Sequence, residues 1–186
     1  NDFICIFILI HVFSGILFRS ISLISSGKLD IFFKDEKFDN ANICTGISGK
    51  KNMFLISLGI FMCWLPYFVK YYPGLIYGDS TISLLQIFGK IPYNNHHPVA
   101  YTLFIKICMA IGSFVGDNTV GVAIYTIFQM IFMSIIFSYS ICWLRNKGIS
   151  KIVCLVVVGF YALPGFWAQH AISMWKDPLF SALVFF

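Results

Sequence analysis

Long apolar runs are the feature of this chain that most constrains its fold. They cover Phe3–Phe18, Asn52–Lys70, Val99–Val115, Val120–Leu144 and Ile152–Ala168. The 186 residues are 59% hydrophobic and 11% charged, whereas a soluble domain has about 25% charged residues. About 20 apolar residues suffice to cross a bilayer as a helix. The composition therefore excludes a soluble globular protein and a disordered chain, and it predicts an all-α fold, a polytopic membrane helical bundle.

The apolar runs divide the chain into two expected parts. Residues 1–51 would hold an extra N-terminal span and a cytoplasmic loop, and residues 52–186 would form a membrane module. The chain has no initiator Met and stops at Phe186 inside an apolar run. We therefore expect a fragment of a longer membrane protein, with residues 52–186 as the N-terminal part of a truncated module.

Basic residues lie in clumps between the apolar runs, so the net charge of +5 indicates membrane topology and not nucleic-acid binding. Lys and Arg favour the cytoplasmic side, which predicts that the stretch 19–51 lies inside. The cluster Arg145, Lys147 and Lys151 would also lie inside only if the run Val99–Val115 does not cross the membrane. The charge pattern therefore favours two outer loops, one that begins at Tyr71, after Asn52–Lys70, and one over Gln169–Lys176, after Ile152–Ala168.

The run Val99–Val115 and the residue just beyond it carry polar side chains at helical spacing. Thr102, Lys106, Ser113 and Asp117 fall within roughly a 60° arc of one helical face. A charge at the bilayer centre costs about 2.5–3.5 kcal/mol on insertion scales. We therefore expect juxtamembrane interfacial helices in the first outer loop, this run among them. The alternative is an ordinary span whose Lys106 faces other helices.

The last three acidic residues of the chain are Asp79, Asp117 and Asp177. Asp79 and Asp177 fall at corresponding places in the two outer loops, where a carboxylate is costly without a partner. Each also has a structural interpretation, because Asp79 can cap a helix over Ser80–Phe88 and Asp177 can cap the last span with Pro178 at its first position. Two such acids on one side of the membrane favour a functional role.

Two further motifs lie near these acids. The sequence Asn94-Asn95-His96-His97-Pro98 precedes the interfacial run, and adjacent histidines can bind a metal or a phosphate, or form hydrogen bonds at the membrane edge. Lys176 can pair with neighbouring Asp177 or with a substrate phosphate. Tyr77, Trp167 and Trp175 are expected as aromatic anchors at the membrane interface.

In their order and context, these motifs resemble those of the GT-C superfamily of membrane glycosyltransferases. Its members carry an acid just after the first core span, as Asp79 does here. A histidine–proline motif then opens a juxtamembrane helix, here His96-His97-Pro98-Val99, and a second acid opens a later span, here Lys176-Asp177-Pro178-Leu179. The chain departs from the family in having one acid in the first loop where many members have two, and Val99 in place of a second proline.

The resemblance implies an inverting glycosyltransferase of the GT-C type, an integral protein of the bacterial plasma membrane with its active site facing outside. Its donor would be a sugar on a polyprenyl phosphate or pyrophosphate. Asp79 would act as general base. Asp177 would hold a divalent cation, Mg²⁺ or Mn²⁺, or place the donor phosphate together with Lys176. Asp79 is a second candidate metal ligand, and the other substrate-binding candidates are His96, His97 and Tyr77.

Two other functions remain open from the sequence. A transporter or flippase of lipid-linked sugars would place its acids in a central cavity near the bilayer midplane, beside broken helices. A non-catalytic membrane subunit would need no base at Asp79. The sequence leaves the sugar and the acceptor open in every case.

Overall fold

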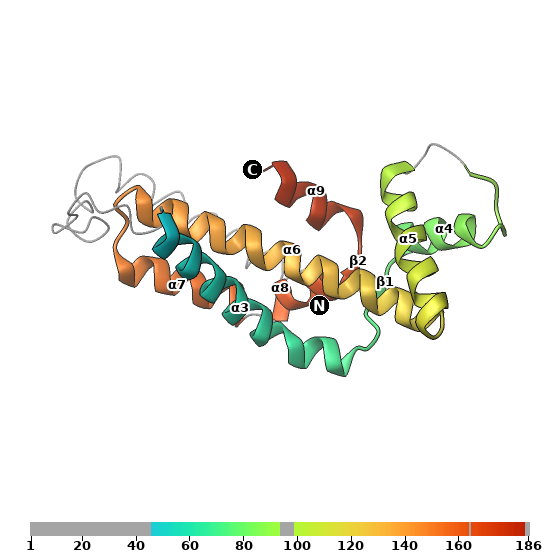
Figure 1. Ribbon diagram of the computed structural model, residues 1–186, viewed down its shortest axis with the longest axis horizontal. Helices are drawn as coiled ribbons and strands as arrows, with labels where there is room; N and C mark the ends of the chain where they lie inside the picture. Colours follow the sequence, from blue (N-terminus) through green and yellow to red (C-terminus); the bar gives the residue numbers. More distant parts are fainter. Residues whose placement is uncertain (1–45, 94–98, 164, 185–186) are drawn as a thin grey trace, which may run out of the picture.

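The computed structural model describes residues 46–93, 99–163 and 165–184, and these residues are mostly helical (Figure 1). They form seven helices and two short strands, in the order α3 (Gly46–Lys70), β1 (Leu75–Ile76), α4 (Gly78–Ile87), α5 (Val99–Val115), α6 (Asn118–Asn146), α7 (Lys151–Ala162), α8 (Gly165–Ile172), β2 (Ser173–Met174) and α9 (Lys176–Val184). The predicted all-α fold is confirmed. The predicted span Phe3–Phe18 lies outside the described residues.

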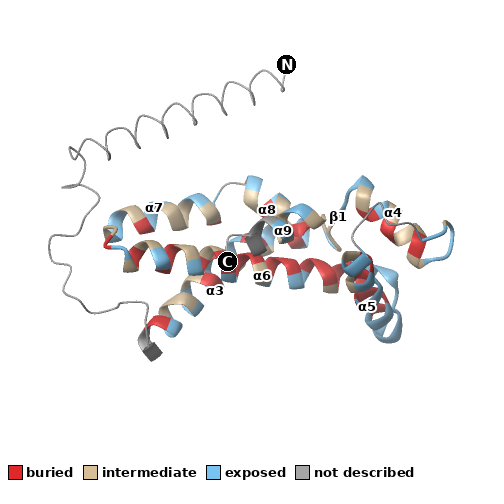
Figure 2. Cartoon of the chain, turned by 90° about the horizontal axis from the view of Figure 1, so that it is seen from above, coloured by how far each residue is buried: buried red, intermediate tan, exposed pale blue. Residues whose placement is uncertain are grey.

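The long helix α6 is the centre of the structure. It is apolar and long enough to cross a membrane, and 56% of its most apolar window is buried inside the protein. The second helix that meets this test, at Gly49–Lys70 within α3, has only 22% of its window buried. Helices α3, α5, α7 and α8 all pack on α6, and Figure 2 shows buried residues along much of its length. Helix α3 begins at Gly46, earlier than the predicted Asn52.

Two helices cover the predicted span Ile152–Ala168. Helices α7 and α8 meet at a bend of 54°, although together they are long and apolar enough for one span. Pro164 separates them in the sequence, and a proline offers no N–H to the preceding turn and restricts the residue before it. Gln169 to Ile172, predicted as part of the second outer loop, belong to α8.

A fully buried tryptophan joins α3 to α7, two of the helices that pack on α6. Trp64 on α3 donates a hydrogen bond from Nε1 to the carbonyl of Tyr161 on α7, at 3.1 Å. Its ring also meets Phe137 of α6 edge-on, with centroids 5.9 Å apart. A buried indole N–H needs a partner, and the carbonyl provides it, so α3, α6 and α7 form one packed unit.

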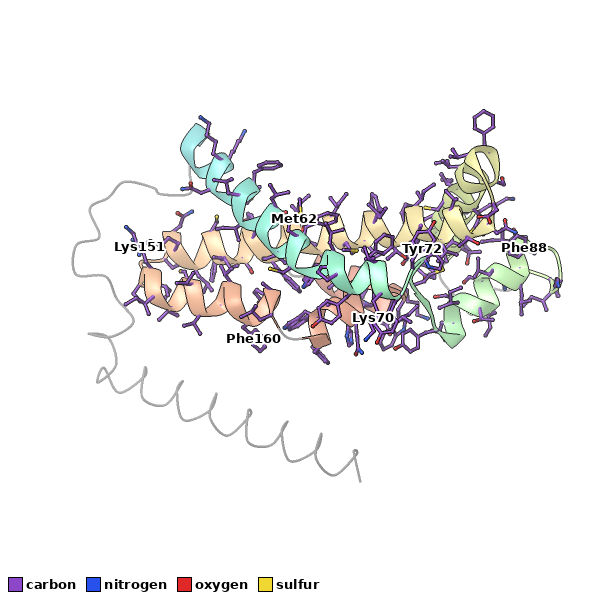
Figure 3. The ribbon with its side chains drawn as sticks, turned by 90° about the horizontal axis from the view of Figure 1, so that it is seen from below. Met62, Lys70, Tyr72, Phe88, Lys151 and Phe160 are labelled. Carbon is purple, nitrogen blue, oxygen red and sulfur yellow. The ribbon has the colours of Figure 1, made fainter. Side chains whose placement is uncertain are left out.

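Charge is distributed unequally between the two ends of this unit. The start of α3, the end of α6 and the start of α7 lie together at one end (Figure 1). The basic residues there are Lys50, Lys51, Arg145, Lys147 and Lys151. The other end, where α4 and α5 pack beside the start of α6, carries all three acids of the described residues together with Lys70, Lys90, Lys106 and Lys176. In Figure 3, Lys151 and Lys70 lie toward opposite ends of the layer.

Helix α5 has the predicted bounds, Val99–Val115, but not the predicted polar face. Thr102 is buried, whereas Lys106 and Ser113 are exposed. Asp117 lies beyond the helix and caps α6, where its side chain accepts a hydrogen bond from the Val120 N–H at 3.0 Å. Spacing alone could not reveal that α6 covers one side of α5 and leaves the rest exposed.

Candidate functional site

The two segments predicted as outer loops meet through the parallel pairing of β1 with β2. Leu75 pairs with Ser173 and Ile76 with Met174. Because the strands are parallel, the chain leaves both in the same direction, and α4 and α9 each begin within two residues of the paired strands. Asp79 is the third residue after Ile76, and Asp177 is the third after Met174. The two acids therefore occupy equivalent positions in paired loops.

An ion pair connects these loops. Lys176 Nζ lies 3.0 Å from Asp79 Oδ2, with 26% of the lysine side chain and 42% of the aspartate side chain exposed. The sequence offered Asp177 or a substrate phosphate as the partner of Lys176, and the structure pairs this lysine with Asp79. An exposed pair of this kind contributes only about 0–1 kcal/mol to stability. Its main consequence is positional, since it brings the Asp79 carboxylate and the Lys176 ammonium together at an accessible place.

Ser80 fixes the helix that carries Asp79. It is fully buried, and its hydroxyl donates to the carbonyl of Met174 in β2. The Ser80 hydroxyl also lies 2.9 Å from the Tyr101 hydroxyl on α5. Burial raises the pKa of Tyr101 above its ordinary value, an effect that the hydrogen bond to Ser80 opposes. The phenol therefore stays protonated and donates a hydrogen bond to the Ser80 oxygen. Contacts with α5 and β2 thus hold the start of α4, and with it Asp79, in place.

Polar side chains on α6 hold the second loop. Gln129 Nε2 donates to the carbonyls of His170, at 2.7 Å, and Ser173, at 2.6 Å. Its Oε1 accepts a hydrogen bond from the Tyr125 hydroxyl at 2.9 Å. Both side chains are fully buried. Backbone carbonyls buried among apolar helices need donors, and Gln129 supplies two of them at the point where α8 becomes β2.

A row of aromatic rings leads away from the ion pair along α8. The ring centroids of Tyr77 and Trp175 are 6.0 Å apart, those of Trp175 and His170 are 6.0 Å apart, and those of His170 and Phe166 are 4.4 Å apart. His170 Nδ1 donates to the Phe166 carbonyl at 2.9 Å. In the neutral ring, Nε2 is then the acceptor. Because its ring contacts Trp175 of the second loop, Tyr77, which is predicted to bind substrate, lies where the two loops meet.

Trp167 connects this row to the aromatic packing between the helices, because its ring meets that of Phe166 edge-on with the centroids 5.2 Å apart. Its ring packs edge-on against Phe137, Phe160 and Tyr161, with centroids 5.1, 5.8 and 5.5 Å away. Aromatic pairs prefer such edge-to-face contacts. The side chain therefore takes part in the packing of α6, α7 and α8.

Neither predicted helix cap has the expected geometry. Helix α4 begins at Gly78, with Tyr77 at its N-cap and no side-chain cap bond, so Asp79 lies inside the first turn. Asp177 likewise lies in the first turn of α9, and Pro178 is the third helical residue. An acid in the first turn is still favoured by the helix dipole. Asp177 is exposed, which leaves it open to a ligand.

The remaining predicted ligands are only partly described. His96 and His97 lie outside the described residues. Within the described ranges, no group of three or more His, Cys, Asp or Glu side chains is close enough to hold a metal ion. The Lys176 ammonium already contacts Asp79, and a positive charge there opposes a cation on this carboxylate.

Sequence reasoning missed the residues that support the site, namely Ser80, Tyr101, Tyr125 and Gln129. One signal was available, because Gln129 is an amide in the middle of the apolar run Val120–Leu144. A polar residue inside a span is expensive and therefore often functional or structural. Its partners, however, are carbonyls of a loop that no local pattern identifies.

The fold defines an all-α protein whose described residues include two helices of membrane-spanning length, and a third if the bent pair α7–α8 counts as one span. The chain belongs to a family of unknown function (DUF6020), whose model matches residues 90–186, just over half of the chain. The match includes Lys176 and Asp177 but begins after Asp79. No curated protein and no solved structure matches this chain.

Proposed function

We propose that this protein transfers a sugar from a polyprenyl phosphate or pyrophosphate donor to an acceptor hydroxyl at the outer face of the plasma membrane, as GT-C glycosyltransferases do. One observation carries the proposal. The acid of the first loop and the lysine of the second lie 3.0 Å apart, in a protein whose helices α3 and α6 are long and apolar enough to span a bilayer. Such an arrangement offers a proton acceptor and a phosphate ligand at the membrane edge.

The two side chains have complementary roles in this reaction. The Asp79 carboxylate takes the proton of the acceptor hydroxyl while the acceptor oxygen forms a bond to the anomeric carbon of the sugar. The bond from this carbon to the phosphate oxygen breaks, and its electron pair goes to the phosphate. Lys176 stabilises the negative charge on the leaving phosphate. Attack opposite the leaving group inverts the anomeric centre.

The remaining candidates have supporting roles in the proposal. Tyr77 would bind the substrate, and its ring contact with Trp175, the residue before Lys176, supports this role. His96 and His97, which lie outside the described residues, are proposed as substrate ligands from the sequence alone. Asp177 is exposed in the first turn of α9; it would hold a divalent cation, Mg²⁺ or Mn²⁺, that neutralises the donor phosphate, or help Lys176 to place that phosphate. No step of the reaction above requires that cation.

The charge distribution supports an outer active site. Lys and Arg favour the cytoplasmic side of a membrane. The end with Lys50, Lys51, Arg145, Lys147 and Lys151 is therefore assigned to the cytoplasm, which puts the paired loops outside. The donor lipid would lie with its phosphate at Lys176 and its chain among the membrane helices.

Transport of a lipid-linked sugar is a second candidate, because the break between α7 and α8 is a feature of transporters that bind substrate at broken helices. The position of Asp79 and Lys176 at helix starts, next to one end of the bundle, favours transfer. A non-catalytic subunit would carry out neither reaction.

The test compares the wild-type protein with Asp79→Asn in lipid nanodiscs, supplied with a polyprenyl-phosphate sugar and a panel of hydroxyl acceptors. The amide keeps the shape of the side chain and removes the base, so product formation should fall by about 10²–10⁴-fold. Asp117→Asn is the matched control, because an asparagine at this N-cap still accepts a hydrogen bond. Equal turnover by Asp79→Asn and wild type would disprove the base assignment, and lipid movement across vesicles without product would favour transport.

A further inference from the structure

We propose that the Asp79–Lys176 pair is an exchange site for a phosphate anion, in which donor binding uncovers the base. In the free protein Lys176 holds Asp79, and the phosphate of the donor lipid then replaces the carboxylate as the partner of Lys176. Asp79 becomes an effective proton acceptor only after this replacement. The inference rests on the proposed sugar transfer and assigns it an order, with the donor binding before the acceptor is activated.

The first support is that the two partners differ in how firmly the protein holds them. Asp79 precedes Ser80, whose buried hydroxyl bonds both to Met174 and to Tyr101, so the start of α4 is fixed. Lys176 carries its ammonium on a flexible four-carbon chain at the start of α9. The lysine can therefore turn to a new partner while the carboxylate stays in position.

The second support is accessibility. Of the two side chains, 26% of Lys176 and 42% of Asp79 remain exposed, and the ion pair lies at the start of two helices and not in the buried core. An anion can therefore approach the ammonium without unfolding either loop. The exposed ring of Tyr77 and the partly buried ring of Trp175 are 6.0 Å apart and lie close in sequence to Asp79 and Lys176, where they offer a surface for the rest of the ligand.

The third support is the chemistry of the two anions. A carboxylate beside an ammonium is a weaker base, because the neighbouring positive charge stabilises its ionised form. A phosphate offers more acceptor oxygens to the ammonium than the single carboxylate oxygen that it replaces, and charge-assisted bonds of this kind are strong. The same exchange thus neutralises the leaving group and releases the base, which prevents activation of an acceptor in the absence of donor.

Zero-length cross-linking with a water-soluble carbodiimide tests the exchange on the wild-type protein. The reagent joins a carboxylate to an amine in direct contact, forming an amide while the carbodiimide takes up the elements of water and becomes a urea. We expect a cross-linked peptide joining Asp79 to Lys176, detected by mass spectrometry. Polyprenyl monophosphate should reduce its yield several-fold, whereas polyprenol, with the same chain and no anion, should not. Inorganic phosphate is tested in the same way: if it lowers the cross-link yield as much as the lipid does, a free anion is the effective ligand, and if it does not, the lipid headgroup is.

Two results would overturn the exchange: absence of this cross-link in the free protein, or a yield that polyprenyl monophosphate leaves unchanged. Asp79→Asn should abolish the cross-link and Asp177→Asn should retain it, which identifies the reacting carboxylate. Sugar transfer is measured separately. Suppression of the cross-link by the lipid phosphate without any glycosylated product would support anion exchange and disprove the sugar transfer.

Discussion

Gly74 lies directly against Thr126. A Cβ atom at Gly74 would come within 2.3 Å of Thr126 Oγ1, and the backbone of Gly74 has a φ of +132°, which side chains rarely permit. The same Cβ would meet the carbonyl oxygen of Ile172 at 2.9 Å. The first loop therefore approaches α6 and the second loop only because residue 74 has no side chain.

Replacement of this glycine should separate the loops. Gly74→Ala adds both a clash and backbone strain, and overpacking of this kind costs about 1–3 kcal/mol. We expect a lower melting temperature in detergent and loss of the Asp79–Lys176 cross-link. Gly78→Ala is the matched control, since no atom lies within 4 Å of a Cβ there. A Gly74→Ala protein as stable as wild type would show that the loops do not approach α6 this closely.

Gln129→Met should weaken the second loop while preserving the length of the side chain. The carbonyls of His170 and Ser173 would lose their donors, and an unsatisfied buried polar group costs about 1–3 kcal/mol. Thermal unfolding measures the loss of stability, and hydrogen exchange in the peptide that contains β2 should become faster. Ser140→Ala is a suitable comparison, because that hydroxyl bonds only to Phe137 of its own helix among the contacts described. Equal exchange in both variants would contradict the role of Gln129.

Ser80 and Tyr101 should show energetic coupling in a double-mutant cycle. We expect Ser80→Ala and Tyr101→Phe to lower the free energy of unfolding by less together than the sum of their separate effects, with a coupling of about 0.5–1.5 kcal/mol. Burial raises the pKa of Tyr101, so the folded state favours the neutral phenol. The coupling should therefore stay constant at neutral pH and decrease only at alkaline pH, above the ordinary tyrosine pKa. Strict additivity at neutral pH would contradict the hydrogen bond.

The orientation of the helices can be tested with reporter fusions. A reporter after Gly148 should report the cytoplasm, because Arg145, Lys147 and Lys151 surround that turn. A reporter after His97, in the first loop, should report the outside. If α5 crossed the membrane as an ordinary span, the two reporters would lie on the same side, and the assignment of the paired loops to the outer face would be wrong.

Local patterns in the sequence predicted several elements well. The bounds of α5 were predicted correctly, because Gly116 and Asp117 interrupt the apolar pattern after Val115. The positions of Asp79 and Asp177 shortly after the helices α3 and α8 also follow from the apolar runs. The predicted cap at Asp79 was wrong, because the helix starts at Gly78 and not at the residue after the acid. Helix starts depend on a few weak hydrogen bonds that a neighbouring strand can shift.

The sequence by itself determined that this is a helical chain with apolar helices of membrane length and that its last acids fall between them, because hydropathy and charge act over short distances along the chain. Only the tertiary structure decided that β1 pairs with β2, that Lys176 contacts Asp79, and that Gln129 holds the second loop. These contacts join residues far apart in the sequence. Their geometry follows from how α3, α6 and α8 pack, a property of the assembled helices that none of the segments carries alone.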